Sequence, residues 1–357
     1  MSKIFIPLFF ICCFQFSKAQ TTDTLHHKFE FKSLYRYAIQ EDIKSILLIL
    51  DTLSVTQLTE SDLVLTKKYI KRFTTKVEIF DYNTSDRFLM EIIDIYRPYW
   101  TSILLKQKSI GIADTILKQN LSKYLIKKNR KLNNWNQVDL RADPMKYLSL
   151  LLTKKGYFNN VDGKTGNLFD IYIWKTQDTT NFNVQLPDDY ISVPVLFMKD
   201  IITLGWEEYA TFGVHYPGGW PRDSVLYCVA KAYDITKEKF LVSYLTHEAQ
   251  HFLDLKKYEK IPSWHLEYRA KLAELCKANE TMIKLLTSFC KGAKNDSTLS
   301  HPYAEYLVIR NLSQRIFKED FVTDIEKWKR VEISLLNQTS TALLRHNTSL
   351  LIFKNKK

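Results

Sequence analysis

The chain has 357 residues, 45% of them hydrophobic, and its formal net charge at pH 7 is +12. This length and hydrophobic content are sufficient for a buried core in one large or two smaller domains. The positive charge is spread over lysine doublets, such as those at 67–68, 127–128 and 256–257, and it forms no dense basic stripe with interleaved aromatic residues. We therefore expect no specific nucleic-acid partner.

Residues 1–19 have the pattern of a signal peptide. Lys3 precedes an apolar stretch from Ile4 to Phe16, which is too short for a typical membrane span, and small residues follow up to Ala19. We expect cleavage near Ala19, export to the periplasm or the extracellular space, and no transmembrane segment in the mature chain. The cysteines left after cleavage are odd in number and irregularly spaced, which excludes a disulfide scaffold.

The remaining chain divides by periodicity. Residues 20–155 are rich in Leu, Ile and Lys, and apolar residues recur with helical spacing at 41–50 and 87–96, so we predict a helical N-terminal region. From residue 156 the pattern changes to short apolar and β-branched runs, and after residue 236 it becomes helical again. The predicted strands are Leu168–Trp174, Phe182–Leu186 and Val193–Phe197. This order predicts an α+β fold, with residues 156–357 forming a second domain of sheet and C-terminal helices.

The segment that follows these strands is expected to form an edge of the sheet. Pro217 and the glycines after it disfavour a central strand, so we place Val214, His215 and Tyr216 at the edge. The apolar run Val225–Val229 predicts a buried strand beside it. A surface turn without function is the alternative for the Pro-Gly-Gly sequence.

A His-Glu-x-x-His motif lies in the next predicted helix. His247 and His251 are four residues apart, so their imidazoles share one helical face and can bind the same metal ion. Glu248 can act beside them as a general base. Zinc binds imidazole nitrogens and carboxylate oxygens, and a catalytic zinc site has three protein ligands. We therefore predict one zinc ion. The alternative is two core or surface histidines next to a solvated glutamate.

A third ligand is expected downstream of the motif. Pro262 precedes a second predicted helix, Trp264–Cys276, which can return a carboxylate to the metal. Glu274 lies two turns beyond Glu267 on the same face, so helix geometry leaves both open as ligands. The full set of candidates is Asp254, Glu259, His265, Glu267, Glu274 and Glu280.

Together these residues resemble the gluzincin metallopeptidases, the group that includes thermolysin and many aminopeptidases. In that group the second helix carries a ligand Glu followed three residues later by Ala, which Glu267 and Ala270 match. The resemblance covers about residues 160–280. It implies Glu267 as the third ligand and a zincin-like core, in which a twisted sheet lies over the motif helix and its edge strand pairs with an extended peptide. Lys271 departs from the pattern, because many gluzincins place Asp or Asn there to orient a ligand histidine, a role for which Glu274 is a candidate.

The expected function is that of an exported zinc-dependent peptidase that acts on a peptide or protein substrate. Glu248 would take a proton from the attacking water and pass it to the leaving amine. A donor for the transition state is also needed, and the candidates lie on a predicted helix opened by Pro302: His301, Tyr303, Tyr306 and Arg310. One alternative is a metal-dependent hydrolase of another bond, or a metal-binding domain without turnover. Another is a non-catalytic exported helical interaction protein.

Overall fold

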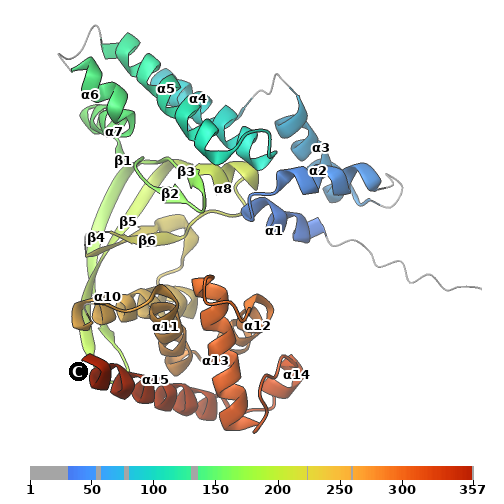
Figure 1. The fold of residues 1–357 in the computed structure, drawn as a ribbon, viewed down its shortest axis with the longest axis vertical. Coiled ribbons are helices and arrows are strands. Elements are labelled where there is room, and N and C mark those ends of the chain that lie inside the picture. The colour runs from blue at the N-terminus through green and yellow to red at the C-terminus, as the bar shows by residue number, and fades with distance from the viewer. Residues whose placement is uncertain are drawn as a thin grey trace, which may run out of the picture.

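The computed structural model describes residues 31–53, 58–75, 80–129, 136–222, 224–258 and 260–355. The predicted signal peptide, its cleavage site at Ala19 and the ligand candidate Glu259 lie outside these ranges. Within them the protein is α+β, and helices gather at both ends of a curled mixed sheet (Figure 1). The predicted fold class is confirmed at this level.

The N-terminal helices form where apolar residues recur at helical spacing and a polar residue caps the first turn. Asp42, Thr59 and Asp86 each accept a hydrogen bond from a backbone N–H of the helix that follows. The buried faces meet in one core around Trp100, which also includes Trp206 from beyond the sheet. The helices are α1 (Leu34–Ile39), α2 (Ile43–Thr52), α3 (Glu60–Thr74), α4 (Arg87–Leu104), α5 (Ile110–Asn129), α6 (Gln137–Ala142) and α7 (Pro144–Lys154).

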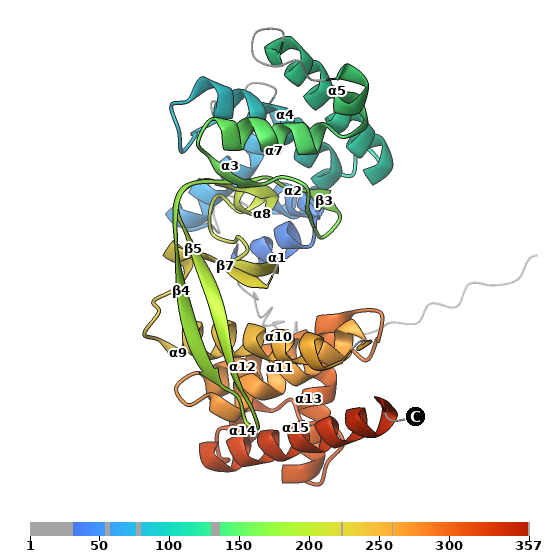
Figure 2. The same ribbon diagram turned by 90° about the vertical axis from the view of Figure 1, so that its left-hand side faces the viewer.

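A five-stranded sheet connects these helices to the C-terminal ones, in the order β1-β4-β5-β7-β6. Its strands are β1 (Phe158–Asn160), β4 (Tyr172–Gln185), β5 (Tyr190–Leu204), β6 (Gly219–Arg222) and β7 (Val225–Val229). Two short strands, β2 (Lys164–Thr165) and β3 (Leu168–Phe169), pair separately. β4 and β5 form a long antiparallel hairpin, β7 runs parallel to β5, and β6 is antiparallel to β7. Figure 2 shows the hairpin extending from the N-terminal helices to the C-terminal ones.

The predicted strand Phe182–Leu186, except its last residue, and the last three residues of the predicted strand Leu168–Trp174 belong to one strand, β4, whereas Leu168 and Phe169 form β3. The residues between them, 175–181, are polar and nearly all exposed, so they carry no alternating hydrophobic signal. They remain in the strand because β5 pairs with β4 along almost its whole length. The sequence therefore locates the two apolar ends but not the continuous hairpin.

Each face of the sheet packs on different partners. Val195, Phe197 and Leu226 belong to the core that the sheet shares with the C-terminal helices. Trp174 and Met198 cluster on the opposite face. β7 lies inside the sheet at the predicted residues, because each of its edges is covered by another strand.

The C-terminal helices follow β7 after a short 3₁₀ turn, η3 (Ala230–Ala232). They are α9 (Glu238–Phe240), the π-helix η4 (Leu241–Thr246), α10 (His247–Lys257), α11 (Ser263–Lys277), α12 (Met282–Gly292), α13 (Ser300–Ile316), α14 (Ile325–Trp328) and α15 (Ile333–Asn355). Across the described ranges, no helix combines the length and apolar character needed to span a bilayer.

The predicted sheet edge is displaced. Val214, His215 and Tyr216 belong to no strand, and β6 begins only at Gly219, so their assignment to the edge strand is wrong. The hydroxyl of Thr211 accepts a hydrogen bond from His215 N (2.9 Å) and lies within donating distance of the carbonyls of Glu207 and His215, so the N–H of His215 is satisfied within a local turn. Among the described strands β6 forms the edge of the sheet on the side of β7, which is its one neighbour, and β1 forms the opposite edge.

Gly205 is required where β5 passes into α8 (Gly205–Ala210). Its φ of +82° is left-handed, and a Cβ at this position would lie 1.8 Å from Oδ1 of Asp170. Asp170 is buried and accepts hydrogen bonds from the backbone N–H of Trp206 (2.9 Å) and the hydroxyl of Tyr172 (2.8 Å). Its short, anchored carboxylate has little room to move aside.

Gly205→Ala should therefore lower the free energy of unfolding by about 3 kcal/mol or more, because backbone strain adds to the clash. Gly213→Ala is a matched control, since Gly213 has the same φ of +82° and no atom lies within 4 Å of the position that its Cβ would occupy. It should lose only about 1 kcal/mol, the cost of the left-handed backbone alone. Urea denaturation followed by circular dichroism measures both, and equal losses would show that the contact with Asp170 is not responsible.

Candidate metal centre

The turn before α10 fixes this helix beneath the sheet. In η4 the hydroxyl of Thr246 donates to the carbonyl of Leu241 five residues earlier (2.8 Å), in the wide turn typical of a π-helix. The hydroxyl of Tyr244 donates to the carbonyl of Tyr227 in β7 (2.9 Å). His247, the first residue of α10, is thus held three residues from a direct contact with the sheet.

His247 and His251 converge as their spacing predicts. Their Nε2 atoms are 3.0 Å apart and their rings are nearly perpendicular, at 83°. Both side chains are only 12–13% exposed. At this distance one of the two nitrogens must carry a proton unless a cation lies between them.

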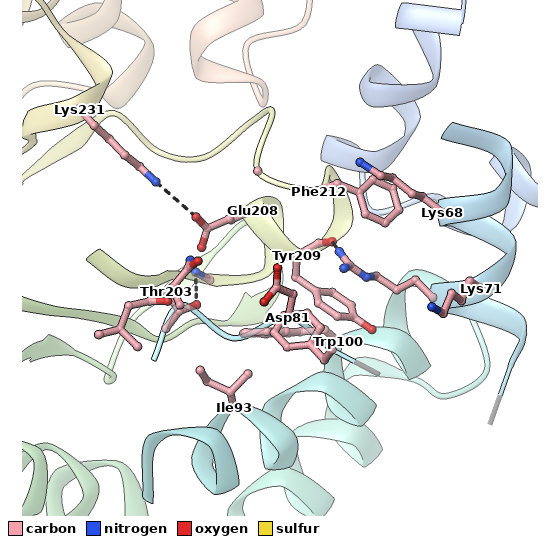
Figure 3. A pocket seen from close by; sticks show the side chains of 16 residues that line it. Lys68, Lys71, Asp81, Ile93, Trp100, Thr203, Glu208, Tyr209, Phe212 and Lys231 are labelled. Atoms are coloured by element: carbon pink, nitrogen blue, oxygen red, sulfur yellow. Dashed lines mark hydrogen bonds and ion pairs between the residues drawn. The ribbon is translucent and has the colours of Figure 1, made fainter. Parts of the chain in front are cut away.

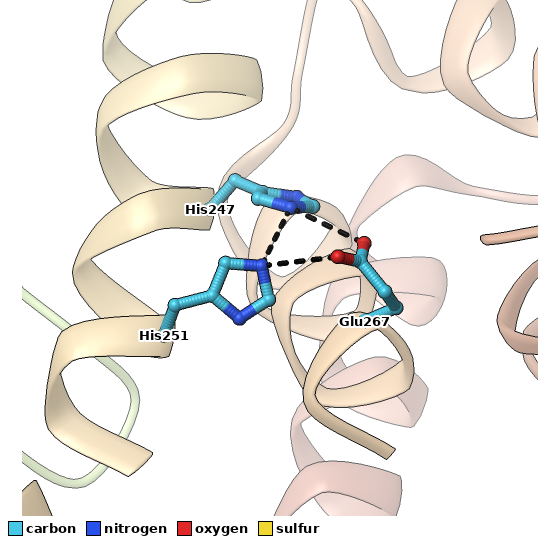
Figure 4. A group of neighbouring side chains, drawn as sticks. All are labelled: His247, His251 and Glu267. Carbon is cyan, nitrogen blue, oxygen red and sulfur yellow. Dashed lines mark hydrogen bonds and ion pairs between the residues drawn. The ribbon is translucent and has the colours of Figure 1, made fainter. Parts of the chain in front are cut away.

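Glu267 completes the group from α11. Its carboxylate lies 3.5 Å from Nε2 of His247 and 3.4 Å from Nε2 of His251. Figure 4 shows the two imidazoles of α10 and this carboxylate pointing toward one another. All three candidate ligand atoms lie within 4.8 Å of one another, so the group could hold a metal ion.

A buried ion pair sets the relative position of the two helices. Asp254 of α10 and Arg269 of α11 are 2.8 Å apart, with side chains 0% and 3% exposed. Arg269 also donates to Asn347 and Thr348 of α15, each at 3.0 Å. Asp254, a ligand candidate by spacing, therefore holds the helices together and does not face the imidazoles.

Glu274 contacts His247 on the other ring nitrogen. Its Oε1 lies 2.6 Å from Nδ1, so the carboxylate accepts the Nδ1 proton and leaves the Nε2 lone pair toward His251 and Glu267. Lys271, which stands where many gluzincins have Asp or Asn, instead forms an ion pair with Glu305 of α13 (3.1 Å). The structure thus separates Glu267, beside both Nε2 atoms, from Glu274, behind one of them.

The charges of this group shift the pKa values of its members. Burial lowers the pKa of His247, but the hydrogen bonds with Glu267 and Glu274 outweigh burial and raise it to about 10. Burial raises the pKa of Glu267, yet its contacts with His247, His251 and His301 hold it well below the usual range. The raised pKa of His247 and the lowered pKa of Glu267 both indicate that the carboxylates of Glu267 and Glu274 stabilise positive charge at this place. They would stabilise the charge of a bound cation in the same way.

Two buried atoms at the centre have no hydrogen-bond partner among the described residues: Oε2 of Glu248 and Nδ1 of His251. A buried polar atom without a partner costs about 1–3 kcal/mol. A cation held by both Nε2 atoms and the Glu267 carboxylate would account for two imidazole nitrogens that lie only 3.0 Å apart beside a carboxylate. Two imidazoles and one carboxylate are a donor set that zinc accepts, so the residues fit this metal.

Glu248 lies next to the ligand group and is itself buried from water. Burial raises the pKa of its carboxyl, while the neighbouring His247 and His251 act in the opposite direction. The phenols of Tyr233 and Tyr244 are close enough for its charge to raise their pKa values further, although burial is the larger cause. A carboxyl with a raised pKa holds a proton more readily than an exposed one, which suits a group that must take up and then release a proton.

Of the four candidate donors on α13, one reaches the centre. Nδ1 of His301 lies 2.8 Å from Oε2 of Glu267, and its side chain is 66% exposed. The others have partners elsewhere: the ring of Tyr303 contacts Trp264, that of Tyr306 contacts Phe321, and Arg310 pairs with Asp320. His215 and Tyr216, which sequence analysis places at the sheet edge, have other partners: the ring of His215 contacts Tyr35, and that of Tyr216 contacts Lys231.

Glu267→Ala should abolish tight zinc binding, because it removes a candidate ligand. Glu274→Ala should weaken zinc affinity about 10-fold to 100-fold, the range for losing a group that orients a ligand. Glu280→Ala, which removes an exposed carboxylate downstream, should leave zinc binding unchanged. Competition with a fluorescent chelator measures all three, and a larger loss for Glu274→Ala than for Glu267→Ala would reverse the assignment of the two glutamates.

No protein-family model matches the chain, and comparison with curated proteins and with solved structures finds no similar one. Any assignment of function therefore depends on the chain's own residues.

Proposed function

We propose that the protein is a zinc-dependent peptidase of the gluzincin type. The observation that carries this function is the convergence of His247, His251 and Glu267 next to the buried carboxyl of Glu248. A zinc ion in such a site acts as a Lewis acid and lowers the pKa of a coordinated water to about 7. His247, His251 and Glu267 would hold it, with Glu274 orienting His247.

Glu248 is the proposed general base. Its Oε2 has no hydrogen-bond partner in the described part of the chain, so one carboxylate oxygen is available to accept a proton from water. Its raised pKa lets it keep that proton and then donate it to the leaving amine. Tyr244 and the sheet fix the helix that carries it, so the carboxyl needs little movement during these transfers.

His301 is the proposed donor to the developing negative charge of the substrate. Its exposed imidazole contacts Glu267 at the edge of the centre, and it comes from α13, a different helix from the one that carries the motif. An imidazole N–H can donate a hydrogen bond to an oxyanion.

The zincin-like arrangement is supported by the order of elements. The edge strand β6 is followed by the inner strand β7, by α10 with the His-Glu-x-x-His motif, and by α11 with Glu267. Gly219 of β6 lies against Tyr244, because a Cβ there would be 2.5 Å from the hydroxyl of that residue. A peptide added to β6 as another strand would therefore lie near the helix of Glu248. Export by the N-terminal segment 1–19 is part of the same proposal.

His247→Ala and His251→Ala should each lose both metal and activity, because two remaining ligands hold zinc poorly. Glu248→Gln should keep the metal and lose activity, since the amide retains the shape of the carboxyl but cannot take a proton. Zinc content by mass spectrometry and cleavage of a peptide library, with and without chelator, measure these effects. If Glu248→Gln stays active, the role of Glu248 is wrong; if zinc binds but no peptide is cleaved, the protein is a different hydrolase or a metal-binding domain.

His301→Gln should retain zinc and lower kcat/KM by about 10²-fold to 10³-fold, the cost of removing one transition-state donor. Tyr303→Phe and Arg310→Ala are matched controls on the same helix and should stay within about twofold of the unchanged protein, because their partners lie elsewhere. Steady-state kinetics with a fluorogenic peptide compares them. Loss of activity in Tyr303→Phe but not in His301→Gln would transfer the role to Tyr303.

A further inference from the structure

A second candidate site lies in the N-terminal part of the molecule, apart from the metal centre. A cavity of about 520 Å³ is bordered by α3, α4 and the α8–Gly213 turn (Figure 3). Neither the metal-ligand candidates nor Glu248 line it. The cavity is therefore separate from the site of the proposed peptidase activity.

Positive charge is concentrated on one side of this cavity. Lys68, Lys71 and Arg72 come from α3 at positions i, i+3 and i+4, so they share one helical face. Like charges at this spacing repel each other, and the cost is repaid if an anion binds between them. Lys71 forms no ion pair with any residue in the described ranges, and its side chain is exposed.

Over the whole cavity lining, cationic side chains outnumber carboxylates. Lys231 joins the three cations of α3, against the carboxylates of Asp81 and Glu208. Glu208 is already engaged, because it accepts a hydrogen bond from Leu204 N (2.7 Å) and lies 3.6 Å from Lys231. The two carboxylates would repel a second negative group, which favours a ligand with a single anionic end.

Aromatic rings form a second part of the lining. The guanidinium of Arg72 lies 4.3 Å from the ring centre of Phe212 and 4.9 Å from that of Tyr209, and it donates to the carbonyl of Tyr209 (2.6 Å). Trp100 is 1% exposed and supplies an apolar wall. Arg72 is thus held in one position before any ligand arrives, which lowers the entropy cost of binding.

Phe212 is held in a strained conformation at this site. Its φ of 55° is left-handed, which costs a bulky residue about 1–2 kcal/mol. The ring packs edge-on against Tyr69, with centroids 4.9 Å apart, and lies below Lys68, whose Nζ is 5.8 Å away. Strain of this kind is concentrated at ligand sites.

We propose that this cavity binds a small organic anion consisting of an aromatic ring and one carboxylate or phosphate group. The anionic group lies between Lys68, Lys71 and Arg72, and the ring lies against Phe212 and Tyr209. Charge-assisted hydrogen bonds to the cations and ring contacts to the aromatic residues supply the affinity.

Isothermal titration calorimetry of the full chain with phenylacetate, phenyl phosphate and benzyl alcohol tests the proposal. At least one of the two anions should bind about tenfold more tightly than benzyl alcohol, which has the ring without the charge, and the tighter anion identifies the group that the site prefers. Binding of the anions should weaken as sodium chloride is raised. The proposal is overturned if neither anion binds, or if benzyl alcohol binds as tightly as both.

Variants of two lysines in α3 test whether the anion binds in this cavity. Lys71→Gln should weaken binding of the tighter anion about fivefold, because it removes one exposed cation from the cavity. Lys67→Gln removes the same charge from α3 outside the cavity and should change the affinity less than about twofold. Equal weakening by the two variants would place the anion in the general field of the helix and not in this cavity. Thermal melts confirm that both variants are folded.

Discussion

The buried ion pair between Asp254 and Arg269 sets the relative position of α10 and α11, and the candidate metal centre depends on that position. Removing one partner of a buried pair costs about 3–5 kcal/mol, whereas the intact pair contributes little net stability compared with apolar residues. Its main effect here is on register. A shift of α11 by one residue would rotate Glu267 by about 100° away from the Nε2 atoms of His247 and His251.

The same register has a second consequence at Glu274, seven residues beyond Glu267. Two helical turns separate these glutamates, so both face α10, one beside the Nε2 atoms and the other at Nδ1 of His247. Arg269 extends the constraint to α15 through Asn347 and Thr348. Three helices therefore position two imidazoles and two carboxylates, although only α10 and α11 supply them.

The locally encoded part of the centre could be predicted from the sequence. His247 and His251 converge because their spacing alone fixes their relative position on a helix. The proximity of Glu267 came from a resemblance, since spacing along α11 left Glu274 equally placed. The sequence indicates Asp254 only as a candidate ligand, because nothing in its position indicates that Arg269, fifteen residues away, is its partner.

The errors in the sheet have a different origin. Val214, His215 and Tyr216 looked extended, but the hydroxyl of Thr211 satisfies the N–H of His215 locally, and the strand starts at Gly219. The middle of β4 gave no strand signal, since its residues face solvent and their pairing with β5 is a property of the main chain. Side-chain patterns do not report hydrogen bonds that the backbone alone makes.

The β4–β5 hairpin is attached to other elements at both of its ends, so it mechanically connects the two sets of helices. Its strands have 14 and 15 residues, about 50 Å each at about 3.3 Å per residue. At one end Ile173 and Ile202 are embedded in the N-terminal core, and at the other Asp188 and Asp189 form ion pairs with Arg345 of α15 and Lys257 of α10. A displacement of α10 and α15 relative to the N-terminal helices must therefore bend a hydrogen-bonded ribbon, so a load applied at one end is transmitted to the other.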